Sequence, residues 1–300
     1  MSQSRGVFLS ISASFLFGLM YYFTSFLHPL SGEEIFGWRM ALSVPMMTVL
    51  MFGLKDWPLV HAILGRLRSE PILWIALPFS SFLLGIQLLL FMWAPLHHLS
   101  LDVSLGYFIL PLSLILTGRI VFGERLTRFQ CVAAILGFVG IANELIQVGT
   151  FSWPVLVINI GYPIYFVLRR KLNINNMGGL WIEALLTLPL ALWFVWQGFD
   201  QQNPFAVNSN LWFLVAGLGL ISTSALICHV MSSRYLPMGL FGLLGYVEPV
   251  LLVGVSLLLG ETIKDHEWMT FIPIWLAVGM LATEGILELK RRHKQSEWGA

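Results

Sequence analysis

The stretch LDVSLGYFILPLSLILTGRIVFGERL, residues 101–126, decides the fold, because the chain echoes it as LFGLLGYVEPVLLVGVSLLLGETI at residues 240–263. Each copy has a Gly-Tyr pair, then a proline, and then an apolar run that closes on Gly-Glu. Each run is long enough to cross a bilayer, which takes about 20 apolar residues. The copies lie almost half the chain apart. This pattern predicts a membrane protein built from two related halves.

The composition is that of a helical membrane protein with many spans. Hydrophobic residues make up 57% of the 300 residues and charged residues only 11%. In a soluble domain, charged residues make up about a quarter of the chain. At about 20 residues per span, a chain of this length with short loops has room for about ten spans and no soluble domain.

The apolar runs place ten helical spans, five in each half, so we predict an all-α membrane protein. The first half covers residues 1–148, the second half residues 153–289, and a basic tail follows at residues 290–300. The longest polar connections are residues 54–70 and 198–210. The expected spans are residues 6–27, 33–53, 71–96, 101–122 and 129–148, then 153–168, 178–197, 211–231, 238–259 and 270–289.

The distribution of positive charge orients these spans. With ten spans threaded from a cytoplasmic N-terminus, all of the 17 Lys and Arg residues except Arg39 and Lys264 fall on or beside the cytoplasmic face. Cytoplasmic loops of membrane proteins carry an excess of Lys and Arg. We therefore expect both termini in the cytoplasm. Five spans per half also invert the second half relative to the first, an arrangement found in many secondary transporters.

No motif of an ATPase or a hydrolytic enzyme occurs in the sequence. It contains no Walker loop, no H-E-x-x-H, no zinc quartet and no nucleophile elbow. Cys131 and Cys228 fall in apolar runs, where cysteine is usually a small core residue, so we predict neither a disulfide nor a metal site. We expect no catalytic residues, no cofactor and no nucleic-acid partner.

Ionisable side chains inside spans are the main functional candidates, because each costs at least about 2.5–3.5 kcal/mol at a helix centre. Arg39 would bind an anionic group such as a substrate carboxylate, or pair with Glu144 on a neighbouring span. Glu248, beside Pro249, would couple transport to protons, contact a cationic group or serve helix packing. Glu144 is a second candidate for coupling. Glu183 lies nearer the inner surface, where it would be solvated or act in a gate.

Aromatic and amide side chains complete the predicted cavity. Tyr107 and Tyr246 are the matching residues of the two echoed stretches, which favours a shared role. The alternative for aromatic residues in a membrane bundle is packing or an interfacial belt. The remaining candidates for a substrate-binding cavity are Tyr21, Trp38, Gln87 and Tyr162.

The two Gly-Glu pairs, Gly123-Glu124 and Gly260-Glu261, lie at span ends and not at mid-membrane. We expect each Glu to cap a following helix or to pair with a nearby Arg or Lys. Both pairs are therefore predicted to be structural.

The motifs resemble those of the drug/metabolite transporter superfamily, and within it the RarD-like branch of EamA-type permeases. The main matches are SLGYFILPL at residues 104–112 with FGERL at 122–126, and LPMGLFGLLGYVEP at 236–249 with LLGE at 258–261. The resemblance extends over nearly the whole chain. Further matches are EEIFGWRMALS at residues 33–43, MWA at 92–94, LRRKL at 168–172 and GLWIEALLTLPLAL at 179–192.

The resemblance implies two inverted EamA repeats around a central cavity that opens alternately to either side of a bacterial inner membrane. Members of the family move small organic solutes, including amino acids, other metabolites and drugs, often outward. Positions that the branch keeps polar or aromatic correspond here to Arg39, Gln87, Tyr107, Glu183 and Tyr246.

The sequence departs from the pattern of this branch at four positions. Trp38 stands where the branch has His, and Gly245 where it has Gln. Gln87 and Leu110 both stand where the branch has Asn. Because these groups belong to the cavity, the substrate of a relative does not transfer to this chain.

The sequence thus predicts a secondary transporter, an exporter of a small organic solute such as an amino acid, a related metabolite or a drug. It would work within lipid as a monomer or homodimer, with protons as the candidate coupling ion. Two other classes stay open. One is a membrane-embedded enzyme with an unrecognised site, and the other is a non-transporting membrane protein or lipid scramblase.

Overall fold

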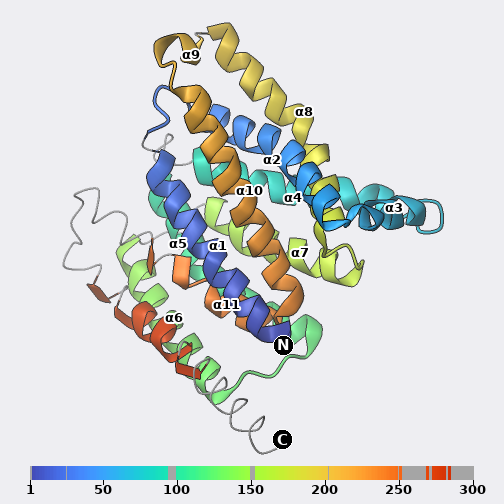
Figure 1. The fold of residues 1–300 in the computed structure, drawn as a ribbon. Coiled ribbons are helices and arrows are strands. Elements are labelled where there is room, and N and C mark those ends of the chain that lie inside the picture. Colours follow the sequence, from blue (N-terminus) through green and yellow to red (C-terminus); the bar gives the residue numbers. More distant parts are fainter. Residues whose placement is uncertain are drawn as a thin grey trace, which may run out of the picture.

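The part of the chain that the structure describes is a bundle of helices. The computed structural model describes residues 2–24, 26–93, 99–148, 153–201, 203–248, 250–251, 268–269, 272–281 and 283–284. These residues form helices joined by turns and contain no β-strand (Figure 1). The predicted all-α class is confirmed.

The helices follow the apolar runs of the sequence, and short connections join most of them. In chain order they are α1 (Ser2–Thr24), α2 (Gly32–Leu54), α3 (Trp57–Arg66), α4 (Leu73–Trp93), α5 (Ser100–Phe122), α6 (Arg128–Val148), α7 (Trp153–Lys171), α8 (Met177–Gln201), α9 (Pro204–Val207), α10 (Leu211–Tyr235) and α11 (Met238–Leu244), and a further apolar helix covers Ile272–Leu281.

Within the described residues, five helices are long and apolar enough to cross a membrane, namely α1, α2, α4, α8 and α10. The shorter apolar helices Gly106–Phe122, Arg128–Asn143 and Ile272–Leu281 coincide with three more predicted spans. α7 coincides with the predicted sixth span, but its basic last turn shortens the apolar run. Residues 252–259 of the predicted ninth span and the basic tail at 290–300 lie outside the described residues. Ten spans and cytoplasmic termini stay predictions.

α3 is a helix within the stretch at residues 54–70, where the sequence indicated only a polar connection. Lys55 ends α2 in a left-handed conformation, and Pro58 lies in the first turn of α3. Val60 and Ile63 are buried in a cluster with residues of α8. Two buried positions three residues apart make a short amphipathic helix, which lies at the edge of the bundle (Figure 1).

The helices of the two halves interleave in a regular pattern. α1 packs along α10 as α4 packs along α7, and α2 packs on α10 as α8 packs on α4 (Figure 1). α2 also packs on α8, and α5 on α11. The helices can be matched in order, α1 with α7, α2 with α8, α4 with α10 and α5 with α11. If each helix is replaced by its match, every contact named here becomes another contact in the same set or stays the same. Exchanging the two halves leaves the pattern unchanged.

α2 and α8, which this matching pairs, approach so closely that only glycine fits at residue 37. A Cβ atom on Gly37 would lie 2.7 Å from the Ala191 backbone oxygen and 2.9 Å from Cγ2 of Val195. Small residues allow such approach in membranes, where lipid gives no hydrophobic driving force between helices. A Cβ atom on Gly53, in the last turn of the same helix, would have no neighbour within 4 Å.

We expect Gly37→Ala to lower the free energy of unfolding by about 1–3 kcal/mol, because the added methyl group forces α2 away from α8. Gly53→Ala is the matched control on the same helix. It is expected to be neutral or stabilising, since alanine is the better helix former and meets no neighbour there. Thermal unfolding in detergent, followed by tryptophan fluorescence, measures both. Equal transition temperatures for the two variants would contradict the close packing.

Candidate functional site

A cavity of about 80 Å³ lies inside the bundle, surrounded by α1, α2, α4, α5, α7, α10 and the α11 segment. It has room for several water molecules. Most of its wall is aliphatic or aromatic, as in sites for small organic molecules. Its polar side chains come from both halves of the chain and are Arg39, Tyr107, Tyr162, Tyr165, His229 and Glu248.

Arg39 is fixed in position and still keeps an unused donor. Its side chain is 2% exposed, and Nε donates to Ser222 Oγ of α10 at 2.8 Å. The hydroxyls of Ser43 and Thr223, 3.0 Å apart, join the same two helices. Arg39 Nη1 is buried without a hydrogen-bond partner among the described residues. Because buried polar groups nearly always have partners, this free donor is an exception inside the bundle.

Tyr107 and Tyr162 form a pair on the cavity wall. Their ring centroids lie 6.2 Å apart, and their hydroxyls share a hydrogen bond. Both tyrosines lie within electrostatic range of Arg39 and of Glu248. The pair therefore adds polar hydroxyls to the cavity wall that also holds the positive and the negative group.

Glu248 lines the cavity just after a break in α11. The helix ends at Leu244, and residues 245–246 form a turn before the chain becomes helical again. A Cβ atom on Gly245 would lie 2.8 Å from the Gly242 backbone oxygen, so this turn favours glycine. The Glu248 carboxyl group lines the cavity and has no hydrogen-bond partner in the part of the chain that the structure describes.

His229 is a cavity residue that the sequence prediction missed. It projects from α10, and its ring contacts Phe17, Phe166 and Phe241 at centroid distances of 5.7, 5.8 and 5.0 Å. Three helices thus fix the orientation of the imidazole, while no described residue hydrogen-bonds to it. The available signal was a lone ionisable side chain in an apolar span.

Two of the predicted cavity residues lie away from the cavity wall. Trp38 packs edge-on against Phe205 and Trp212, at centroid distances of 5.4 and 6.4 Å, in an aromatic cluster. Gln87 joins α4 to α7, since its Nε2 donates to the Val157 backbone oxygen at 2.9 Å. Gln87 Oε1 is buried and has no hydrogen-bond partner among the described residues.

Tyr246 and Tyr107 match in sequence but differ in location. Tyr246 follows the break in α11 and is fully buried against α6. A Cβ atom on Gly137 would lie 2.7 Å from the Cζ atom of Tyr246, so the ring packs directly on the α6 backbone. Ile141 and Ile274 belong to the same cluster. The turn thus directs this ring away from the cavity, and its hydroxyl has no partner in the described part of the chain.

Two further candidates are placed by their backbones alone. Tyr21 lies on α1 and Glu144 on α6, and the side chains of both fall outside the described residues. Among the residues that the structure describes, no group of three or more His, Cys, Asp and Glu side chains is arranged to hold a metal ion.

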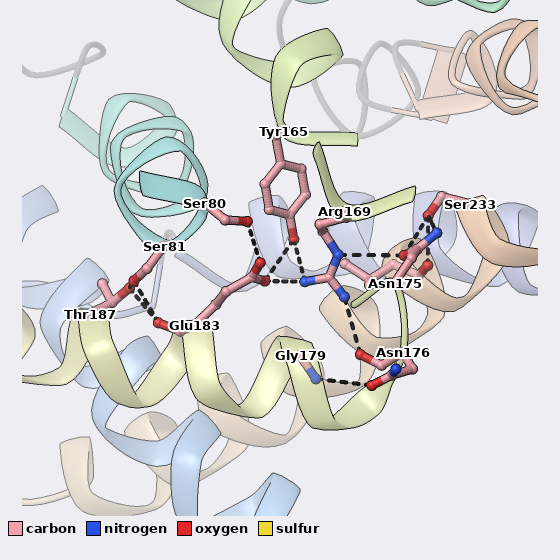
Figure 2. Close-up of polar contacts among 11 residues, drawn as sticks. Ser80, Ser81, Tyr165, Arg169, Asn175, Asn176, Gly179, Glu183, Thr187 and Ser233 are labelled. Atoms are coloured by element: carbon pink, nitrogen blue, oxygen red, sulfur yellow. Dashed lines mark hydrogen bonds and ion pairs between the residues drawn. The ribbon is translucent and has the colours of Figure 1, made fainter. Parts of the chain in front are cut away.

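Glu183 lies outside the cavity wall, in a fully buried ion pair with Arg169 (Figure 2). Arg169 Nη1 and the Ser80 hydroxyl both donate to the Glu183 carboxylate. The Tyr165 hydroxyl donates to Glu183 Oε2 at 3.2 Å and accepts from Arg169 Nη1 at 3.2 Å. These contacts join α4, α7 and α8. The ring of Tyr165 also lines the cavity, so this network borders it directly.

Neutral groups accept the remaining hydrogen bonds of the Arg169 guanidinium. Nη2 donates to the Asn176 backbone oxygen at 3.1 Å, and Nε donates to Asn175 Oδ1 at 3.4 Å (Figure 2). Asn175 in turn hydrogen-bonds to Ser233 of α10. Both charges of the pair are therefore fully partnered, in contrast to Arg39 and Glu248.

We expect Glu183→Gln to lower the free energy of unfolding by about 3–5 kcal/mol, because Arg169 would stay buried without a counter-charge. The double variant Arg169→Met/Glu183→Met should recover most of this loss, since it removes both charges and keeps the volume. Thermal unfolding in detergent compares the variants. A Glu183→Gln protein as stable as the wild type, or a double variant less stable than Glu183→Gln, would contradict this account.

No family model matches the chain, but curated relatives match almost its whole length. Chloramphenicol-sensitive protein RarD of Pseudomonas aeruginosa is 39% identical over 294 residues, which cover 98% of each chain. An uncharacterized transporter of Pasteurella multocida is 38% identical over 290 residues, 97% of this chain and 99% of the relative. Protein RarD of Escherichia coli is 30% identical over 300 residues, 97% of this chain and 98% of the relative.

A solved crystal structure of a protein shares the fold, with a TM-score of 0.64 over 93% of this chain and 99% of the other. At 16% identity, this likeness concerns the fold alone. The curated relatives are closer in sequence, and their names describe transporters or RarD proteins. The chain therefore belongs to the family of RarD-like membrane transporters, as its motifs predicted.

Proposed function

We propose that the chain is a secondary transporter that moves a small organic solute outward across a bacterial inner membrane by alternating access. The relatives named as transporters support the class. The contacts among α1, α2, α4 and α5 and the matched α7, α8, α10 and α11, which an exchange of the two halves leaves unchanged, support two inverted repeats. The cavity lies between these halves, where transporters of this kind hold their solutes.

We also propose the ten-span topology with both termini in the cytoplasm. Arg170, at the end of α7, donates to backbone oxygens at the end of α10 and to Glu124, just after α5. These three helices therefore finish at the same end of the bundle. Their last turns contain Arg119, Arg170 and Arg234, among other basic residues. Such a concentration of positive charge supports a cytoplasmic location for this end.

The observation that carries the proposal is the presence of two unsatisfied charged groups in one cavity. Arg39 Nη1 is a donor suited to a carboxylate, and Glu248 is an acceptor suited to an ammonium group. The tyrosine pair lies within range of both, and the aromatic wall would take an apolar side chain. A zwitterionic and partly apolar solute such as an amino acid matches this chemistry.

A thermal-shift screen on detergent-purified protein tests the site. The panel contains amino acids, and also chloramphenicol because the name of the Pseudomonas aeruginosa relative refers to it. We expect a zwitterionic solute to stabilise the wild type, and Arg39→Gln to weaken its apparent affinity at least about tenfold, since hydrogen bonds to charged groups contribute about 1.5–3 kcal/mol.

The matched control for this screen is Arg66→Gln. Arg66 is the last residue of α3, away from the cavity, and pairs with Glu70 four residues further on. Its replacement removes the same charge and should leave solute affinity unchanged. A solute that binds Arg39→Gln as tightly as the wild type would show that Arg39 does not hold it.

Glu248→Gln tests the coupling. In proteoliposomes, we expect the wild type to show counterflow and to respond to an imposed pH gradient. The Glu248→Gln protein should bind the solute more weakly but keep counterflow at saturating solute, and it should lose the response to the gradient, because an amide cannot exchange a proton. Radiolabelled solute uptake measures both. A variant that still responds would locate coupling elsewhere, and a wild type without counterflow would contradict a carrier.

A further inference from the structure

The first Gly-Glu pair lies where the two halves meet. Gly123 ends α5 with a φ of 64°, a left-handed conformation that favours glycine. The Glu124 backbone N–H then bonds back to the Gly118 oxygen at 3.1 Å. This turn brings the Glu124 side chain to the start of α11.

Glu124 binds the first turn of α11 with both carboxylate oxygens. Oε1 accepts from the Met238 backbone N–H at 2.7 Å, and Oε2 accepts from the Gly239 backbone N–H at 2.8 Å. These donors have no partner within the helix, and the helix start favours negative charge. Glu124 thus caps a helix of the other half of the chain, 114 positions away for Met238.

Arg170 holds the same carboxylate from the other side. Its Nη1 donates to Glu124 Oε1 at 3.0 Å, and its Nη2 donates to the backbone oxygens of Ser233 at 3.0 Å and Leu236 at 2.7 Å. The guanidinium carbon lies 4.7 Å from the centroid of the Phe122 ring. The ends of α5, α7 and α10 and the start of α11 are therefore joined by one ion pair.

The helices joined in this way close one end of the cavity. A Cβ atom on Gly118 of α5 would lie 3.0 Å from the Gly239 backbone nitrogen, and one on Gly242 would lie 2.8 Å from the Pro111 backbone oxygen. α5 and α11 are thus in backbone contact from the cavity wall, which includes Pro111 and Gly242, to Glu124. Separation of α5 and α11 would open the cavity at this end.

We propose that the Glu124–Arg170 pair with the first turn of α11 is a releasable clasp that keeps the cavity closed at the basic end of the bundle. The proposal rests on the alternating-access function proposed above. Glu124 belongs to the first half and α11 to the second, so the clasp opens whenever the halves rock apart at this end.

The two ion pairs near this end differ in how easily they open. Arg169 and Glu183 are both 0% exposed and belong to the consecutive helices α7 and α8 of one half. The Glu124 and Arg170 side chains are 15% and 25% exposed. Water can therefore solvate both charges of the clasp as they separate, whereas the buried pair would lose its partner without compensation.

Thiol labelling of a cavity residue tests the clasp. Val230, which lines the cavity, is replaced by cysteine in a Cys131→Ser/Cys228→Ser background. A membrane-impermeant maleimide is applied to inside-out and to right-side-out vesicles. Glu124→Gln should raise the labelling rate from the cytoplasmic side about tenfold and lower it from the outer side, because losing charge-assisted hydrogen bonds favours the open form.

Glu70→Gln is the matched control. The hydrogen bonds from Arg66 hold the pKa of the Glu70 carboxyl below its usual value, so this variant removes one full negative charge, but it touches no contact between α5 and α11. Its labelling should equal that of the parent. Arg170→Gln, which keeps the cap on α11, should give a smaller increase than Glu124→Gln and serves if that variant does not insert.

The outcomes separate this proposal from the proposed function. A parent protein labelled from both sides, with rates that neither Glu124→Gln nor Arg170→Gln changes, would overturn the clasp and leave alternating access standing. A parent labelled from one side only, in every variant, would overturn both. If Glu70→Gln raised the labelling rate as much as Glu124→Gln, the loss of a surface charge would explain the increase, and this would also overturn the clasp.

Discussion

The structure depends on the rule that a polar side chain inside a membrane bundle needs a partner inside the protein. Most polar groups here obey it: Arg169 and Glu183 satisfy each other with help from Ser80 and Tyr165. Arg39 Nη1 and the Glu248 carboxyl are exceptions within the described residues, and both belong to one cavity. Because both are charged and line the same cavity, they are the basis for the solute site proposed above.

Close contact between matched helices organises the rest of the bundle. α2 meets α8 at Gly37, and α5 meets α11 at Gly118 and Gly242. Glycine lets two helix backbones come into direct contact, which stabilises helix association in lipid. Such contacts require no side chain to rearrange when the helices tilt. The polar contacts make the two ends of the bundle different, because Glu124 and Arg170 lie only at one end of the α5–α11 contact. The glycine contacts hold the two halves together, and the polar contacts favour one orientation of the halves relative to each other.

The lengths of the apolar runs predict most of the helices. Which side chains pair with each other, and which way they point, follows only from the structure. α3 was missed because a ten-residue amphipathic helix shows no long apolar run. The sequence singled out Arg39, Tyr107 and Glu248 by their cost in lipid or by their repeat, and the structure brings them to one wall. Nothing local to Glu183 reveals Arg169 as its partner, since a basic residue at a span end suggests only the cytoplasmic face. Tyr246 matches Tyr107 in the repeat, yet the break at Gly245 turns it toward α6.

Tyr165 has one face in each of two environments. Its ring is part of the cavity wall, and its hydroxyl is bonded to both members of a fully buried ion pair. Displacement of the ring would stretch both hydrogen bonds inside the protein, where unpaired polar groups are costly. A change at the cavity wall would in this way reach the ion pair that joins α7 and α8.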